Sequence, residues 1–387
     1  RERAYKVQKL LADTGLSKGV TLAMQSVDPH TLETIKRDNI STQDYEELQK
    51  KFTKDGIATY TEFILALPGD TYDSFANGVS SVIQAGQHNR IQFNNLSILP
   101  NAEMAEPENI KRDQIKTVGG PIVNVHGSLD ETPEDAIYES QQLVISTRTL
   151  SFNDWKKTRV YASVAEFLYF NKIAQIPLMV LNSLEKIEFR ELFEHFLINS
   201  DKYETLKKIK NSLQDHSEQI AKGKSEFLYK EGYLDIYWPP GEFEYIKLVI
   251  DQKLDLFYDE LKEHFVKFCK STLTKKIFEE SLELNKKLMR TPTEQNDEVF
   301  EENFNILENY HQILKLNKPK FISKNNKFLI IRSDMKFDSV QDWMQEVIWY
   351  GHRSGKYLCN IKDLNEGGKD FSDIKDSDKF KGDSFPM

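Results

Sequence analysis

Polar side chains that could bind a small ligand stand beside short apolar runs of the sequence. Gln25 and Ser26 directly follow one such run, and Glu62 opens another. An amide can both donate and accept hydrogen bonds, whereas an ionised carboxylate can only accept them. Arg37 lies between the two runs, and its planar guanidinium offers paired donors to a carboxylate. Together these residue types suit a ligand that carries amino, hydroxyl and carboxylate groups.

The elements that must position these residues alternate between strands and helices. The sequence predicts strands over 20–25, 61–67 and 91–99, separated by helices over 28–37, 42–54 and 73–85. Asp28 and Pro29 open the first of these helices, as its N-cap and its first helical residue. Strands that alternate with helices favour a parallel sheet or barrel, and parallel barrels build their active sites at the carboxyl ends of the strands.

The first two predicted strands each have a large apolar face and an opposite face of smaller residues. Gln25 lies on the smaller face of the first strand, and Glu62 lies on the smaller face of the second. Burying an unpaired carboxylate in so apolar a strand is strongly unfavourable. The pattern therefore predicts a barrel wall with a ligand in its interior.

Three segments give the chain a resemblance to a known family. They are Gln25-Ser26, Leu67-Pro68-Gly69-Asp70 and Pro100-Asn101. In order and spacing they resemble the ends of strands four, five and six in the barrel of radical S-adenosylmethionine (SAM) enzymes. The resemblance covers roughly residues 15–105. It departs from the family pattern at Ala66, where the family usually has Gly, and at Asp70, where it usually has Glu.

The resemblance implies a chemistry, a set of cofactors and partners. In this family a [4Fe–4S] cluster on a Cys-x3-Cys-x2-Cys loop cleaves SAM to a 5′-deoxyadenosyl radical, and the protein orients SAM. By position, Gln25, Ser26, Arg37 and Glu62 would contact SAM. Similar proteins with a large helical extension often carry a cobalamin-binding domain, and methyl transfer or a carbon-skeleton rearrangement is their usual chemistry. A small-molecule substrate and a reductant such as a ferredoxin or flavodoxin would be the partners.

The cysteines do not supply this cluster. Cys269 and Cys359 are the only two in the sequence and stand far apart, so neither a disulfide framework nor a cluster motif is predicted. We expect the chain to be truncated upstream of the cluster loop and to be inactive as an isolated fragment. Two cysteines without a disulfide pattern favour a reducing, cytoplasmic setting.

Length and pattern predict an α/β chain with a partial (βα) barrel of the TIM type and a mainly α-helical domain. We place the later half of the radical SAM barrel over 1–105, the helical substrate or accessory domain over 106–362, and a disordered tail over 363–387. Within the second part we expect an irregular connection over 107–135 and a helix over 132–149. The tail is rich in Lys, Asp, Gly and Ser, a composition typical of disorder.

Charge and hydropathy argue against two classes of partner. The formal net charge of −9 has the wrong sign for a protein that grips phosphate backbones, so we expect no nucleic acid. No run of 18 or more apolar residues occurs in the sequence, so we expect no membrane span.

Two other functions fit the same residues. One is a different βα-barrel enzyme, a lyase or aldolase, in which Glu62 works as an acid or base. The other is a non-catalytic interaction protein built from the later helices. Gln25 and Glu62 could also be satisfied polar groups in a barrel wall, and Arg37 could simply favour a helix C-terminus. Asn94 and Asn95 could line the barrel interior, but the alternation does not decide which of them does.

Overall fold

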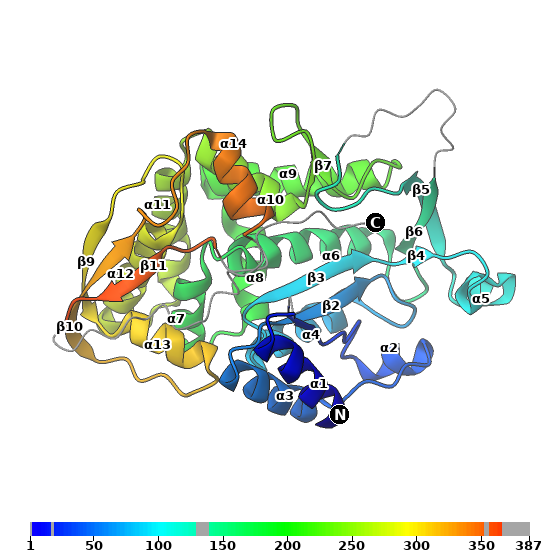
Figure 1. The fold of residues 1–387 in the computed structure, drawn as a ribbon. Helices are drawn as coiled ribbons and strands as arrows, with labels where there is room; N and C mark the ends of the chain where they lie inside the picture. Colours follow the sequence, from blue (N-terminus) through cyan, green and yellow to red (C-terminus); the bar gives the residue numbers. More distant parts are fainter. Residues whose placement is uncertain (1, 17–18, 129–138, 352–355, 366–387) are drawn as a thin grey trace.

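A computed structural model describes residues 2–16, 19–128, 139–351 and 356–365 (Figure 1). They form a mixed α/β structure in which small sheets pack among many helices. Most of the tail predicted to be disordered, residues 366–387, lies outside the described residues, as does 129–138. Among the described residues no single helix is both long and apolar enough to cross a membrane.

The first sheet is parallel and has the strand order β1-β2-β3. Its strands are β1 (Val20–Thr21), β2 (Thr59–Leu65) and β3 (Arg90–Asn95). Helix α1 (Glu2–Asp13) precedes β1, helices α2 (Pro29–Thr34) and α3 (Thr42–Lys54) connect the first two strands, and α4 (Tyr72–Gln84) connects the last two. The parallel order confirms the alternation predicted from the sequence. Closure of such a sheet into a barrel stays a prediction.

The parallel sheet has one buried face and one partly exposed face. Phe63 and Ile91 are buried on the first face, where Phe63 meets Phe75 of α4 edge to face. The opposite side we call the open face. In strand order it consists of Tyr60, Glu62, Ile64, Arg90, Gln92 and Asn94. Strand alternation therefore gathers polar side chains on a surface where they need not be desolvated.

The first strand is shorter than the sequence predicts. Thr21 pairs with Tyr60, but Gln25 pairs with Phe63, so one extra residue is accommodated on the first strand between these pairs. Such a bulge breaks the two-residue alternation of side chains. The expectation that Gln25 simply continues one face of a strand over 20–25 was therefore wrong.

The region after β3 differs most from expectation. The predicted strand over 91–99 divides into β3 and β4 (Ser97–Ile98), and β4 joins a second, antiparallel sheet with the order β4-β6-β5. The supposedly irregular 107–135 contains α5 (Pro107–Arg112) and β5 (Lys116–Pro121). The predicted helix over 132–149 was wrong too, because its described part contains β6 (Ser140–Ser146). Pairing of β6 with two neighbours overrides the local helical pattern.

The later part of the chain is mainly helical. Its longer helices up to residue 288 are α6 (Phe152–Ala165), the π-helix η2 (Glu166–Phe170), α7 (Gln175–Glu185), α8 (Phe189–Asn199), α9 (Glu204–Ile220), α10 (Pro240–Ile250), α11 (Leu254–Phe265) and α12 (Thr272–Leu288). The short 3-10 helices η3 (Ser200–Lys202) and η4 (Val266–Phe268) follow α8 and α11. A short hairpin, β7 (Leu228–Tyr229) and β8 (Tyr237–Trp238), precedes α10. The remaining elements are β9 (Glu298–Phe304), α13 (Ile306–Leu314), β10 (Ser323–Ile331), α14 (Val340–Trp343), η5 (Met344–Trp349) and β11 (Asn360–Asp363).

One large hydrophobic core joins the parallel sheet to these helices. Phe63 and Ile91 belong to the same buried cluster as Phe167 of η2 and Phe193 of α8. The hydroxyl of Tyr161 in α6 donates to the carbonyl of Ala76 in α4 at 3.2 Å. The helices thus cover the face of the sheet that lies opposite the open face.

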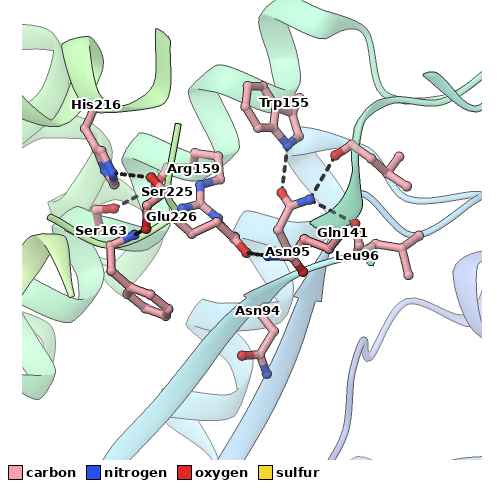
Figure 2. Close-up of polar contacts among 12 residues, drawn as sticks. Asn94, Asn95, Leu96, Gln141, Trp155, Arg159, Ser163, His216, Ser225 and Glu226 are labelled. Atoms are coloured by element: carbon pink, nitrogen blue, oxygen red, sulfur yellow. Dashed lines mark hydrogen bonds and ion pairs between the residues drawn. The ribbon is translucent and has the colours of Figure 1, made fainter. Parts of the chain in front are cut away.

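The side chain of Asn95 links the parallel sheet to the antiparallel sheet and to α6 through hydrogen bonds, as Figure 2 shows. Its side-chain nitrogen donates to the carbonyls of Leu96 and Val144 at 3.0 Å each, and its oxygen accepts from Nε1 of Trp155 at 2.8 Å. Asn95 is 8% exposed, so it is structural and does not line an interior cavity. Asn94 is the one that lies on the open face.

We predict that Asn95→Leu destabilises the protein by about 2–4 kcal/mol, because the buried Trp155 N–H and two carbonyls lose their partner. Urea unfolding followed by circular dichroism measures this change. Asn94→Leu is the matched control, with an expected change below about 0.5 kcal/mol at a partly exposed position. Equal losses in the two variants would contradict the role assigned to Asn95.

The turn between β2 and α4 contains a buried aspartate, Asp70. Asp70 is 2% exposed, and its carboxylate accepts from the backbone N–H of Thr71 at 3.0 Å and from the hydroxyl of Ser74. Thr71 in turn caps the first turn of α4. Burial raises the pKa of Asp70 to about 6, against these hydrogen bonds.

A folded-state pKa near 6 makes the contribution of Asp70 to the free energy of unfolding depend on pH. Between the ordinary aspartate pKa of 3.8 and about 6, the folded state binds the proton more tightly than the unfolded state does. The stabilisation is therefore complete below about pH 4 and is lost as pH rises through 6. We predict that the unfolding free energy falls by about 1–3 kcal/mol more from pH 4 to pH 6.5 in the unaltered protein than in Asp70→Asn. Parallel curves for the two proteins would contradict this.

Candidate functional site

A cavity of about 520 Å³ lies where the three parallel strands end. One part of its lining is apolar and consists of Ile35, Ile64, Leu67, Leu96 and Met104. The other part is polar and consists of Gln25, Lys36, Arg37 and Asp38. Because the carboxyl ends of parallel strands meet at one edge of a sheet, segments far apart in the sequence share this cavity. An apolar wall with a few polar groups is the usual chemistry of a small-molecule pocket.

Gln25 reaches the cavity from a bent backbone. Its φ angle is +57°, in the left-handed region that costs a residue with a Cβ about 1–2 kcal/mol. Backbone pairing with β2 holds Gln25 there. Its backbone N–H donates to the backbone carbonyl of Glu62 at 2.8 Å, and its carbonyl accepts from the backbone N–H of Ile64 at 2.9 Å. The bend turns Gln25 out of the regular strand alternation.

Left-handed residues other than glycine recur around the cavity. Gln25, Lys36 and Ala66 have φ angles of +57°, +55° and +67°, and Asn101 has +65°. Ala66 stands where the family pattern has Gly, and its left-handed backbone explains why Gly is suited to that position. Left-handed residues also occur outside the cavity lining, for example Lys186 and Gln252.

Two hydrogen bonds hold the side chain of Arg37 at the wall of the cavity. Its Nη2 donates to the carbonyl of Ala23 at 3.0 Å, and its Nε donates to the side-chain oxygen of Asn39 at 2.9 Å. Nη1 has no hydrogen bond to any residue within the described part of the chain. The guanidinium is therefore fixed in orientation and keeps a donor for a ligand.

Asn39 holds the turn at Gln25 together, and the sequence analysis did not single it out. Its side-chain nitrogen donates to the carbonyls of Met24 at 2.6 Å and Ser26 at 2.7 Å. The only signal for this role in the sequence is the Arg-x-Asn spacing that follows α2. An asparagine at a helix end is common enough that such a signal carries little weight alone.

Ser26 does not line the cavity. It is buried, and its hydroxyl accepts from the backbone N–H of Asp28 at 3.1 Å. Asp28 then caps α2 by accepting from the N–H of Thr31 at 2.8 Å. Ser26 thus shapes the turn that carries Gln25.

Glu62 lies on the open face of β2, paired with Gln92 of β3. It does not line the cavity, although Ile64, the next residue on the same face, does. Residues two apart in a strand are separated by about 6.6 Å. The structure therefore brings Gln25 and Arg37 together, and places Glu62 one step further along the open face.

The turn after β2 explains the Pro-Gly sequence. Gly69 has a φ angle of +93°, and a Cβ there would lie 2.8 Å from the hydroxyl of Thr34 in α2. Only glycine allows both this backbone and this close approach. The turn thereby packs α2 against the end of β2 and keeps Leu67 at the cavity.

The two cysteines are unsuited to holding a metal cluster. Burial raises the pKa of both Cys269 and Cys359 to about 11, which disfavours the thiolate form that binds metals. Across residues 2–16, 19–128, 139–351 and 356–365, no group of three or more His, Cys, Asp or Glu side chains could hold a metal ion.

Comparison with known proteins gives related methyltransferases. No family model matches the sequence. The chain is 34% identical over 168 residues to the cobalamin-dependent radical SAM methyltransferase TokK of Streptomyces tokunonensis, which is 43% of this chain and 24% of that protein. It is 32% identical over 194 residues to the 2-(S-pantetheinyl)-carbapenam-3-carboxylate methyltransferase of Streptantibioticus cattleyicolor, 50% of this chain and 28% of that protein.

The matches thus span about a quarter of the length of these curated relatives. Both relatives are methyltransferases, and one of them is a radical SAM enzyme by name. The similarity supports the resemblance of this chain to radical SAM enzymes.

Proposed function

We propose that this chain is the SAM-binding part of a cobalamin-dependent radical SAM methyltransferase. The observation that carries the proposal is the cavity at Gln25 and Arg37, which draws its lining from the ends of successive parallel strands. The similarity to two methyltransferases supports it.

The chemistry of the cavity fits SAM. Adenine is flat and largely apolar, and Ile64, Leu96 and Met104 offer it an apolar wall. The methionine carboxylate needs donors, and Arg37 has Nη1 available. The cavity volume of about 520 Å³ lies within the range of small-molecule pockets. Gln25 can accept from the amino group or donate to the ribose.

Ser26 and Glu62 belong to the proposed site in different ways. Ser26 supports SAM binding indirectly, because it shapes the turn that presents Gln25. Glu62 would accept a hydrogen bond from the ribose or the amino group of SAM at the margin of the cavity. The rival function, in which Glu62 is the acid or base of a lyase, has less support because Glu62 stands outside the cavity lining.

The remaining cofactors and partners extend the proposal. A [4Fe–4S] cluster would supply the electron for cleavage of SAM, and a ferredoxin or flavodoxin would reduce it. Its cysteine ligands would come from residues outside this sequence, since Cys269 and Cys359 do not fit them. Cobalamin would take part in methyl transfer to a small-molecule substrate. One relative is named for a carbapenam carboxylate, and we extend the class, a small carboxylic acid, to this chain.

We predict that Arg37→Lys weakens SAM binding to the full-length protein by about tenfold, because lysine cannot keep the hydrogen bonds to Ala23 and Asn39 that fix the orientation of the guanidinium. Equilibrium dialysis measures the affinity. Binding of 5′-methylthioadenosine, which has no carboxylate, should change less than twofold in the same variant. Equal losses for both ligands would contradict a carboxylate contact of Arg37.

Gln25→Asn tests the second contact, since asparagine tolerates the left-handed backbone but is one methylene shorter. We predict about tenfold weaker SAM binding. Lys50→Ala, at an exposed position on α3, is the control and should leave the affinity unchanged. Unchanged SAM affinity in both Arg37→Lys and Gln25→Asn would reject the proposed site.

A further inference from the structure

One wall of the cavity belongs to a short segment that projects from the molecule. It contains the 3-10 helix η1 (Glu103–Ala105) and α5 (Pro107–Arg112), and its residue Met104 lines the cavity. Figure 1 shows α2 and α5 at the same edge of the molecule, with α5 standing out beyond β4 and β5. We call residues 102–112 the η1–α5 segment.

Both ends of the η1–α5 segment are fixed in one sheet. Strand β4 precedes it and β5 follows it, and both strands pair with β6. At its carboxyl end Asp113 is buried, and the backbone carbonyl of Asp113 accepts from the N–H of Arg148 at 2.7 Å. The chain turns through left-handed backbone on either side, at Asn101 (φ +65°) and at Gln114 (φ +50°). Residues at the ends of elements are where a hinge takes up changes in φ and ψ.

Between these ends the segment is lightly packed. In η1 and α5, which the structure describes in full, no residue is buried. Met104 and Ile110 are half-buried and pack at the margin of a small core that contains Leu143 and Trp155. Segments with little buried apolar surface open at a low cost in free energy. The η1–α5 segment can therefore move while the sheet that carries it stays folded.

Hydrogen bonds join η1 and α5 into one unit. The side-chain nitrogen of Asn109 in α5 donates to the backbone carbonyl of Glu103 at 2.6 Å. The side-chain oxygen of Asn109 accepts from Nη1 of Arg112 at 2.6 Å. Because these contacts lie within the segment, a movement of its ends displaces Glu103 and the neighbouring Met104 together.

An ion pair joins the η1–α5 segment to the opposite wall of the cavity. Nζ of Lys36, which lines the cavity just after α2, pairs with the carboxylate of Glu103. This wall is held in place, because the next residue, Arg37, donates to the carbonyl of Ala23. The side chains of Lys36 and Glu103 are 70% and 63% exposed. An ion pair this exposed is weak and screened by salt, so it can break and form again.

We propose that the η1–α5 segment is a lid over the cavity and that the Lys36–Glu103 ion pair is its latch. With the latch formed, Met104 lies against the ligand and the lid shields it from water. With the latch broken, the segment moves on its two ends and the ligand can leave. The inference rests on the proposed function for the identity of the ligand, SAM. It deepens that function by assigning the residues that control release of SAM.

The first test measures how fast radiolabelled SAM leaves the full-length protein after an excess of unlabelled SAM is added. We expect Glu103→Gln and Lys36→Gln each to raise the dissociation rate about threefold, the scale of one exposed ion pair. Combining Lys36→Glu with Glu103→Lys should bring the rate back to that of the unaltered protein, because the latch forms with reversed charges. A direct contact between Lys36 and SAM would give no such recovery. Glu46→Gln, which breaks an exposed ion pair with Lys50 on α3, is the matched control and should leave the rate unchanged.

The second test follows amide hydrogen exchange by mass spectrometry in the ligand-free protein. Amides of residues 102–112 should exchange about threefold faster in Glu103→Gln, because the lid is open more often. Exchange in β6 should not change, and Glu46→Gln should match the unaltered protein throughout. An unchanged dissociation rate or an unchanged exchange rate in Glu103→Gln, or no recovery in the charge-reversed pair, would overturn the proposal. Absence of SAM binding to the unaltered protein would instead count against the proposed function, and the exchange measurement would still decide whether the lid exists.

Discussion

The candidate SAM site depends on one strained turn and the side chains that hold it. Gln25 adopts a left-handed backbone, which opposes folding by about 1–2 kcal/mol. Three hydrogen bonds offset this strain: two from the amide of Asn39 to Met24 and Ser26, and one from Arg37 to Ala23. Because the same contacts fix Arg37, one network places both proposed ligand contacts at the end of the parallel sheet.

At the candidate SAM site a polar side chain is held by neighbouring groups before any ligand arrives, since Arg37 donates to Asn39 and to the carbonyl of Ala23. Groups held in this way lose little further freedom when they bind, which favours both affinity and a defined orientation. The large core behind the sheet holds the strands whose ends line the cavity, because these strands pack directly on the helices.

Local signals allowed much of the framework to be predicted from the sequence. The helix expected over 42–54 has those bounds, with Ser41 as N-cap, and Asp28 caps α2 as expected. The shape of the site could not be predicted, because the bulge before Gln25 and the role of Asn39 depend on pairing across the sheet. The β6 strand was missed for a similar reason.

The central claim is that SAM binds at the ends of the three parallel strands. A crystal structure of the full-length protein with SAM measures this most directly. We predict adenine against Leu96 and Met104, with the methionine carboxylate at Nη1 of Arg37. SAM bound elsewhere, with Gln25 and Arg37 free of ligand, would contradict it.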